Sequence, residues 1–213
     1  MKVEYIDHMG NDDSIASAAR VSFDKRAETY PPDANHGLIR YLAENGHEIP
    51  FAHTAITLRV TAPISIRVQA FKSKIGFVES EVSRRYVSTT PEYDIPVFRY
   101  KHHDKKQGSG EVIQPQIGLQ ELYANHFDTS IELYEELLNQ GVAPEQARFV
   151  LPQGVDTQWV WTGSLLAFAR FYRLRSHPHA QKEIQDLAHM VSDIIAPLYP
   201  VAWAALTGVK AND

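Results

Sequence analysis

Three short segments of the chain have the composition and spacing of β-strands. The clearest alternates Ile56, Leu58 and Val60 with polar residues, which predicts a strand with one buried face and one wet face. A second pattern opens the chain, and a third contains two tryptophans between polar residues. The predicted strands cover residues 2–6, 54–61 and 156–162.

Apolar residues that recur at spacings of three and four predict helices between and after these strands. Pro63 and Pro144 suit a first helical turn, Gly46 and Gly141 suit a stop, and the polar residues 11–14 suit an N-terminal cap. Two prolines and Gly37 interrupt the chain before the second helix. The predicted helices cover residues 15–23, 38–45, 64–74, 119–139, 144–151, 164–175 and 179–196.

The same spacing predicts which helical faces are buried, and it shows where the chain is irregular. The residues expected to point inward are Ile64, Val68 and Phe71 in one helix, and Leu122, Ile131, Tyr134 and Leu138 in another. Residues 101–116 are polar and contain two glycines and a proline, so we expect a mobile loop without chemistry. No repeat or linker divides the chain, which indicates one α/β domain over residues 1–213.

The amino-acid composition excludes several classes of protein and of chemistry. Of 213 residues, 44% are hydrophobic and 22% charged, which is the balance of a globular protein. No cysteine is present, which removes disulfides, cysteine-ligated metals and thiolate nucleophiles. A formal net charge of -5 gives no overall reason to bind nucleic acid. Neither a signal segment nor an apolar run long enough for a membrane span is visible, so we expect a cytoplasmic protein without a membrane partner.

Most short catalytic motifs are missing. The chain has no glycine-rich dinucleotide fingerprint, no phosphate-binding P-loop and no nucleophile elbow around a serine. His47 and Glu48 are followed by Pro50 and His53, a spacing that does not suit a zinc helix. We therefore expect no metal site.

Two basic segments stand out against the acidic whole. Residues 69–86 place lysines, arginines and serines among apolar residues, and residues 169–181 contain three arginines. Such groups suit phosphate and pyrimidine recognition, because guanidinium and hydroxyl groups form charge-assisted hydrogen bonds. A solvated basic surface with ordinary salt bridges explains the same residues, and spacing alone leaves both interpretations open.

Together these segments resemble the flavin-dependent thymidylate synthases. The signature of that family begins Arg-His-Arg and continues to a serine and an Arg-Tyr pair. Here Lys72, Ser73 and Lys74 take the first position, while the second half matches with one extra residue between the halves. Further blocks occur in family order over most of the chain. They are AARVSFD, NGHEIPFAHTAITLRVTAPI, ARFVLP and LRSHPHAQKEIQ.

The resemblance implies a fold, an activity and partners. The fold is α/β (α+β), with a mixed central sheet flanked by helices. The activity is reductive methylation of dUMP to dTMP, with methylenetetrahydrofolate as carbon donor and FAD reduced by NADPH. The family forms homotetramers whose active sites lie where subunits meet. The missing cysteine agrees with this route, because the other kind of thymidylate synthase requires a thiolate.

The resemblance also implies residue roles. Arg175 is the expected catalytic residue, because a fixed guanidinium stabilises negative charge on the pyrimidine ring. Ser83 is assigned to binding, since no general base is visible beside it. The expected dUMP-binding residues are Gln69, Glu81, Ser83, Arg84, Arg85, Arg148 and Arg175. The expected FAD-binding residues are His47, Lys72, Ser73, Lys74, Glu81, Ser164, Arg170 and His179.

Departures from the family pattern keep alternatives open. Lys-Ser-Lys retains two charges but loses the planar guanidinium groups, Ala52 stands where a glutamate is common, and Arg170 stands where other branches have asparagine. A related enzyme that transfers another one-carbon unit, such as hydroxymethyl, is the first alternative. A non-catalytic nucleic-acid-binding module, with aromatic residues that stack on bases, is the distant one.

Overall fold

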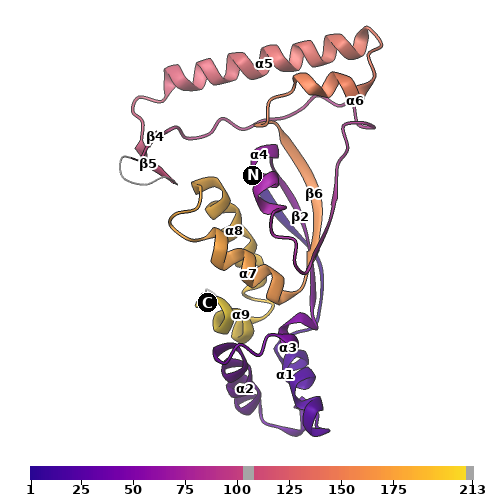
Figure 1. The fold of residues 1–213 in the computed structure, drawn as a ribbon, viewed down its shortest axis with the longest axis vertical. Helices are drawn as coiled ribbons and strands as arrows, with labels where there is room; N and C mark the ends of the chain where they lie inside the picture. Colours follow the sequence, from indigo (N-terminus) through magenta and orange to yellow (C-terminus); the bar gives the residue numbers. More distant parts are fainter. Residues whose placement is uncertain (103–107, 210–213) are drawn as a thin grey trace.

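The centre of the fold is a four-stranded sheet in the order β1-β2-β6-β3, and every neighbouring pair is antiparallel. The computed structural model of the protein describes residues 1–102 and 108–209. Figure 1 shows the strands running through the middle of the molecule. Their bounds are Lys2–Met9 for β1, Ala55–Pro63 for β2, Phe77–Glu81 for β3 and Asp156–Gly163 for β6.

The alternating sequence of β2 and β6 gives the sheet two different faces. Leu58 lies opposite Trp161 and Val60 opposite Trp159, and all four side chains are buried on the inner face. On the outer face the hydroxyl groups of Thr57 and Thr162 are 3.0 Å apart and share a hydrogen bond. Because side chains alternate across a strand, one register fixes both faces.

Helices cover the inner face. In Figure 1, α7 and α8 lie beside the sheet and α9 lies below them. The apolar stripe of α8, with Ile184, Leu187 and Val191, is fully buried, as expected for an amphipathic helix against a core. These helices are α4 (Ile64–Ala70), α7 (Leu165–Arg175), α8 (Lys182–Ile195) and α9 (Pro200–Thr207).

A second group of helices forms the opposite end of the molecule from α5 (Figure 1). Asn11 caps α1 in a capping box with Ser14, which satisfies the free N–H groups of the first turn. The carboxylate of Asp12 accepts hydrogen bonds of 2.9 Å from the N–H groups of Val201 and Ala202, and so joins α1 to α9. This group comprises α1 (Asp12–Arg20), η1 (Val21–Phe23), η2 (Ala27–Thr29), α2 (Pro32–Glu44) and α3 (Ile49–Ala52).

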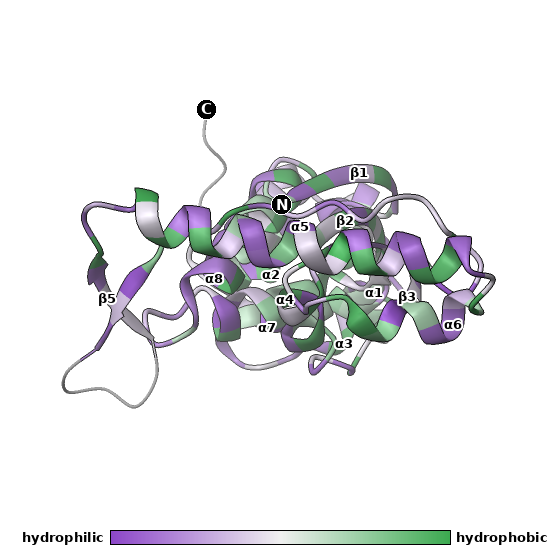
Figure 2. Cartoon of the chain, turned by 90° about the horizontal axis from the view of Figure 1, so that it is seen from above, coloured by the Kyte–Doolittle hydropathy of each residue, from purple (hydrophilic) through white to green (hydrophobic). Residues whose placement is uncertain are grey.

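The long helix α5 lies outside this core. Figure 2 shows it along the outside of the molecule, with polar and apolar residues interspersed. Of its side chains, Phe127 and Tyr134 are buried, whereas Leu122 is 69% exposed. The neighbouring elements are β4 (Arg99–Lys101), β5 (Ser109–Val112), α5 (Ile117–Asn139), α6 (Pro144–Ala147) and η3 (Arg148–Val150).

The predicted α+β fold class is confirmed, and several details are corrected. The central sheet is antiparallel rather than mixed. The helix predicted over 64–74 ends at Ala70, and its Val68 is exposed because Ile66 and Ala70 take the buried positions. Leu122 also points outward. The helix predicted from residue 38 begins at Pro32 and runs through Gly37, because proline suits the first turn and one glycine is tolerated inside a helix.

The segment 101–116 is more ordered at its ends than expected. Residues 103–107 lie outside the described residues, but the flanks pair as β4 and β5. Arg99 on β4 also forms an ion pair of 2.8 Å with Glu183 on α8. The hairpin is therefore attached to the helical layer.

Candidate active site

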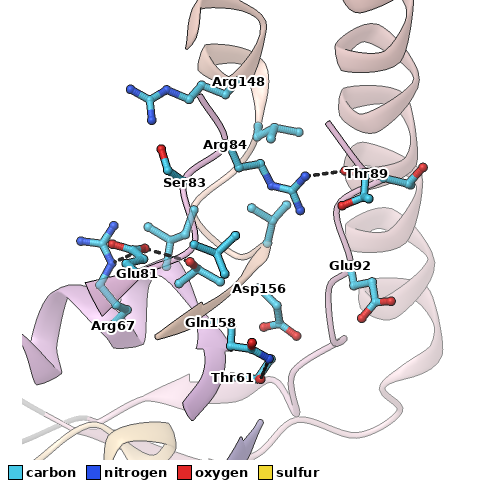
Figure 3. Close-up of a pocket in the computed structure, with 16 residues that line it drawn as sticks. Thr61, Arg67, Glu81, Ser83, Arg84, Thr89, Glu92, Arg148, Asp156 and Gln158 are labelled. Atoms are coloured by element: carbon cyan, nitrogen blue, oxygen red, sulfur yellow. Dashed lines mark hydrogen bonds and ion pairs between the residues drawn. The ribbon is translucent and has the colours of Figure 1, made fainter. Parts of the chain in front are cut away.

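A cleft of about 610 Å³ opens between α4, the end of β3 and the start of β6. The turn after β3, the segment around Thr89 and Glu92, and η3 complete its wall (Figure 3). The ends of β3 and β6 meet here because Glu81 lies opposite Trp159 in the antiparallel pair. The cleft thus lies where strands give way to irregular chain that carries polar side chains.

One side of the cleft is cationic. Arg84 and Arg148 both line it, together with the hydroxyl of Ser83 (Figure 3). Arg84 Nη1 donates to the carbonyl oxygen of Thr89, and Arg148 Nε donates to that of Glu145 at 3.2 Å. These bonds leave further guanidinium N–H groups available, since each arginine has five. Each guanidinium is a suitable donor to a phosphate group, and in Figure 3 the two point in different directions.

Glu81 faces this cleft with one carboxylate oxygen already engaged. Thr157 Oγ1 donates to Glu81 Oε1 at 2.8 Å, and Arg67 Nε lies 3.0 Å from the same oxygen. Arg67 comes from α4 and Thr157 from β6, so two elements fix one side chain. Figure 3 shows Arg67 and Glu81 side by side at one edge of the cleft.

Asp156 lies at the first position of β6 and lines the same cleft. Its Oδ1 is buried and has no hydrogen-bond partner among the described residues. Burial raises the pKa of Asp156 from its ordinary value of 3.8 to about 6, with smaller contributions from Asp94 and Glu92, while the N-terminal amine opposes them. Such a carboxyl group is a candidate for contact with a ligand, because buried polar atoms normally have partners.

Arg175 does not line this cleft. It is the last residue of α7, and its Nη2 donates to the carbonyl oxygen of Gln69 at 2.9 Å. Its Nε is buried and has no hydrogen-bond partner in the described part of the chain. Burial lowers the pKa of Arg175, but arginine remains protonated at neutral pH. The Gln69 side chain contacts Gln181, and α4 carries both Gln69 and Arg67.

The Lys-Ser-Lys segment follows the end of α4. Ser73 Oγ is buried without a hydrogen-bond partner among the described residues, and Lys72 is exposed. Lys74 forms an ion pair with Glu79 and lies 4.9 Å from the Phe71 ring centroid.

The same segment approaches the start of α7. The N–H of Ser164 donates to the carbonyl of Gly76, and its hydroxyl caps α7 by accepting from the N–H of Ala167. A Cβ on Gly76 would lie 2.9 Å from that of Ala167, and φ is +82° there. Glycine is therefore required where the loop meets the helix.

Besides Gln69, Arg175, Ser164 and the Lys-Ser-Lys residues, four further predicted site residues do not line the cleft. Arg170 forms an ion pair with Glu48, and His47 beside it contacts the ring of Tyr41. His179 is exposed, and its N–H donates to the ring of His177. Arg85 does not line the cleft and forms an exposed ion pair of 3.1 Å with Glu145.

Comparisons with known proteins agree with one another. The family described as "Thymidylate synthase complementing protein" matches residues 4–201. The flavin-dependent thymidylate synthase of Thermosipho africanus is 37% identical over 94% of this chain and 88% of its own. That of Thermus thermophilus is 35% identical over 95% of this chain and 74% of its own.

The chain belongs to the flavin-dependent thymidylate synthase family. The predicted resemblance is confirmed. The fold is also similar to that of a solved structure, a UMP/dUMP methylase, PolB from Streptomyces cacaoi, bound with 5-Br dUMP. The TM-score is 0.89 and the identity 28%, over 98% of this chain and 95% of the other.

Sequence reasoning missed several residues of the cleft, among them the charged side chains of Arg67, Glu92 and Asp156. Arg67 was not recognised because the predicted helix had its buried face assigned to other positions. The available signal was that Arg67 shares a helical face with Phe71, four residues later. Asp156 is the first residue of a predicted strand. An acidic residue at the end of a strand was the signal that could have marked it as a candidate site residue. Within residues 1–102 and 108–209, no group of three histidine or acidic side chains is arranged to hold a metal ion. No helix in those ranges is long and apolar enough to cross a membrane.

Proposed function

We propose that the protein methylates dUMP to dTMP, with methylenetetrahydrofolate as carbon donor and with FAD reduced by NADPH. The observation that carries this function is family membership over residues 4–201, in a chain whose cleft collects Ser83, Arg84 and Arg148. A chain without cysteine lacks the thiolate that the other kind of thymidylate synthase needs.

In this function the cleft binds the nucleotide. The guanidinium groups of Arg84 and Arg148 and the hydroxyl of Ser83 bind the phosphate, because charge-assisted hydrogen bonds to anions are short and strong. The free oxygen of Glu81 accepts a hydrogen bond from a sugar hydroxyl. Arg85 joins the phosphate contacts in exchange for its exposed ion pair with Glu145, which contributes little to stability.

Arg175 performs the electrostatic step, with Gln69 beside it. Its guanidinium, held by the Gln69 carbonyl, is placed against a ring oxygen of the pyrimidine. Negative charge develops on that ring when C5 becomes nucleophilic, and a fixed positive group stabilises it without reorganisation. The unpartnered Nε of Arg175 is an available donor for this purpose.

The residues after α4 fit a flavin. Ser73 supplies a buried hydroxyl without a partner among the described residues, Lys72 supplies an exposed ammonium, and Ser164 lies at the N-terminus of α7. These donors suit the pyrophosphate and ring carbonyl oxygens of FAD. When bound, the flavin supplies the reducing equivalents. Lys74, His47, Arg170 and His179 complete the proposed set, and Arg170 must release Glu48 to contribute.

A homotetramer explains why these groups lie apart in one chain. Arg175 contacts the Gln69 carbonyl of α4 but does not line the cleft, so we propose that neighbouring subunits bring the two together. The exposed apolar side chains of α5 support this assembly, because large exposed apolar surfaces mark interfaces. They include Ile117 at 61% exposure and Leu122 at 69%.

The alternatives gain no support from the comparisons. A hydroxymethyl transfer and a non-catalytic nucleic-acid-binding module are both less favoured than methylation, since the similar proteins are named as synthases or a methylase. The cytoplasmic location and the absence of a nucleic-acid partner stay predictions.

A product assay tests the proposal. The purified protein is incubated with dUMP, methylenetetrahydrofolate, FAD and NADPH, and the nucleotides are analysed by mass spectrometry. We expect dTMP, and omission of FAD or NADPH should abolish it. A hydroxymethylated nucleotide would instead support the first alternative. No turnover and no flavin uptake, with steeply salt-dependent binding to single strands, would support the binding module.

A further inference from the structure

Arg67 occupies an unusual place for a charged residue. It lies in the short helix α4, it lines the cleft, and its side chain is only 25% exposed. Its guanidinium carbon is 5.2 Å from the centroid of the Phe71 ring, which packs edge-on against Trp159. Desolvation of a guanidinium is costly unless a partner compensates it. The partner here is Glu81.

The contact between Arg67 and Glu81 involves one nitrogen of the guanidinium and one oxygen of the carboxylate. Arg67 Nε forms an ion pair of 3.0 Å with Glu81 Oε1 but makes no hydrogen bond within the described residues, whereas Thr157 Oγ1 donates a hydrogen bond to that same oxygen. No hydrogen bond to Glu81 Oε2 or to the two Nη groups of Arg67 is present in the described part of the chain. One carboxylate oxygen is therefore anchored, while the other and two amino groups remain available at the edge of the cleft (Figure 3).

The acidic side chains of the cleft would repel an anionic nucleotide, and Arg67 offsets part of this repulsion. A nucleoside monophosphate is an anion, yet Glu81, Glu92 and Asp156 all line the same space. Like charges repel strongly in a partly desolvated site. Arg67 is the cation in contact with Glu81, so it offsets the repulsion between that carboxylate and the phosphate.

We propose that Arg67 is a positioning residue for the nucleotide: it fixes Glu81 Oε1 so that Oε2 meets a sugar hydroxyl, and it neutralises Glu81 against the phosphate. This inference rests on the proposed function and adds a residue outside the signature segments. Lysine would keep the charge but not the planar geometry at Nε, because its ammonium is a point charge on a flexible chain.

Equilibrium binding to the flavin-loaded enzyme tests this role. Titration calorimetry compares dUMP with deoxyuridine, which lacks the phosphate, in wild type and in Arg67→Met. We expect the Kd for dUMP to rise about thirtyfold and that for deoxyuridine about threefold, because the charge effect requires the phosphate. In steady-state assays the KM for dUMP should rise while kcat changes by less than about threefold.

A double-mutant cycle isolates the contact with Glu81. In the Glu81→Gln background, Arg67→Met should weaken dUMP binding by less than about threefold, because the charge that Arg67 neutralises is gone. Arg67→Lys should restore most of the difference between dUMP and deoxyuridine. Arg40→Met, which removes an exposed arginine from α2 at the other end of the molecule, is the matched control and should bind both ligands like wild type.

Two results overturn the inference. Equal losses for dUMP and deoxyuridine, or the same loss in both Glu81 backgrounds, would show that Arg67 acts without neutralising Glu81. Thermal unfolding of each variant checks that it is folded, and Arg67→Gln, which also removes the charge, replaces Arg67→Met if the latter does not fold. Wild-type enzyme that binds no dUMP would contradict the proposed function itself, a failure distinct from either of these.

Discussion

The inner face of the sheet and the cleft at its end are made of the same strands, but their side chains have different surroundings. Those of the inner face pack against other side chains, whereas some in the cleft lack a partner. Trp161 on β6 is 1% exposed and packs against three phenylalanine rings. The distances between ring centroids are 4.5 Å to Phe77, 5.2 Å to Phe168 and 4.9 Å to Phe171. Asp156, five residues earlier on the same strand, has a buried oxygen without a partner in the described chain.

This difference separates stability from function along one strand. Apolar burial and aromatic packing stabilise the inner face without any ligand. The cleft keeps charged and unpartnered groups that cost stability, which is typical of sites shaped for binding. Substitutions on the inner face should therefore affect folding, and substitutions near the cleft should affect binding and turnover.

The largest effect is expected from Trp161→Ala. Removal of this ring leaves a cavity in the core, so the free energy of unfolding should fall by about 3–5 kcal/mol. Urea unfolding followed by circular dichroism measures it. The matched control is Val160→Ala on the outer face, which should cost less than about 1.5 kcal/mol. Equal losses in the two variants would contradict the assignment of the faces.

Arg175→Ala should lower the catalytic activity while leaving the folded structure intact. Loss of its electrostatic stabilisation should lower kcat/KM by roughly a hundredfold or more, equivalent to about 2.7 kcal/mol. The melting temperature should stay close to that of wild type. dTMP formation measures the first effect and calorimetry the second. Near-normal turnover would show that the catalytic group lies elsewhere.

Asp156→Asn should make stability less dependent on pH. Because burial raises the pKa of Asp156 from 3.8 to about 6, the folded state binds the proton more tightly than the unfolded state. Wild-type stability should therefore fall as the pH rises from about 4 to about 6. The variant lacks this loss and should be more stable at pH 8 by about 1 kcal/mol, after allowance for solvent screening. Urea unfolding at several pH values tests this, and parallel pH profiles for both proteins would refute it.

Arg85→Ala should have the smallest effect on stability. Its ion pair with Glu145 is half exposed, so the free energy of unfolding should change by about 0.5 kcal/mol or less. If Arg85 binds the phosphate, the Kd for dUMP should nevertheless rise about tenfold or more. Glu145→Gln is the control, since it removes the partner but keeps the guanidinium. A larger loss of stability than of affinity would make Arg85 a structural residue.

Much of the fold could be predicted because its signals are local. Alternation along β2 and the capping residues of α1 specify those elements without help from distant parts of the chain. The strand β3 could not be found in this way, because Phe77–Glu81 alternates only weakly and is a strand through its pairing with β6. Val68 and Leu122 were misplaced since spacing gives a face of a helix but not the direction of the core.

For the site, the types of residue were readable in the chain and their grouping was not. The basic segments and the wider family resemblance identified Glu81, Ser83, Arg84 and Arg148, and the fold brings these four to one cleft. Whether Arg67 pairs with Glu81, and whether Arg175 lies beside Gln69 rather than in that cleft, depends on contacts between residues far apart in the sequence.

The sequence by itself determined the family, the alternation that makes the sheet two-faced, and the absence of a cysteine nucleophile. Only the tertiary structure decided which charges share a cavity and which neutralise one another. The physical reason is range: periodicity and capping act over a few residues, whereas the burial of Asp156 and the pairing of Arg67 with Glu81 arise when α4, β3 and β6 pack together.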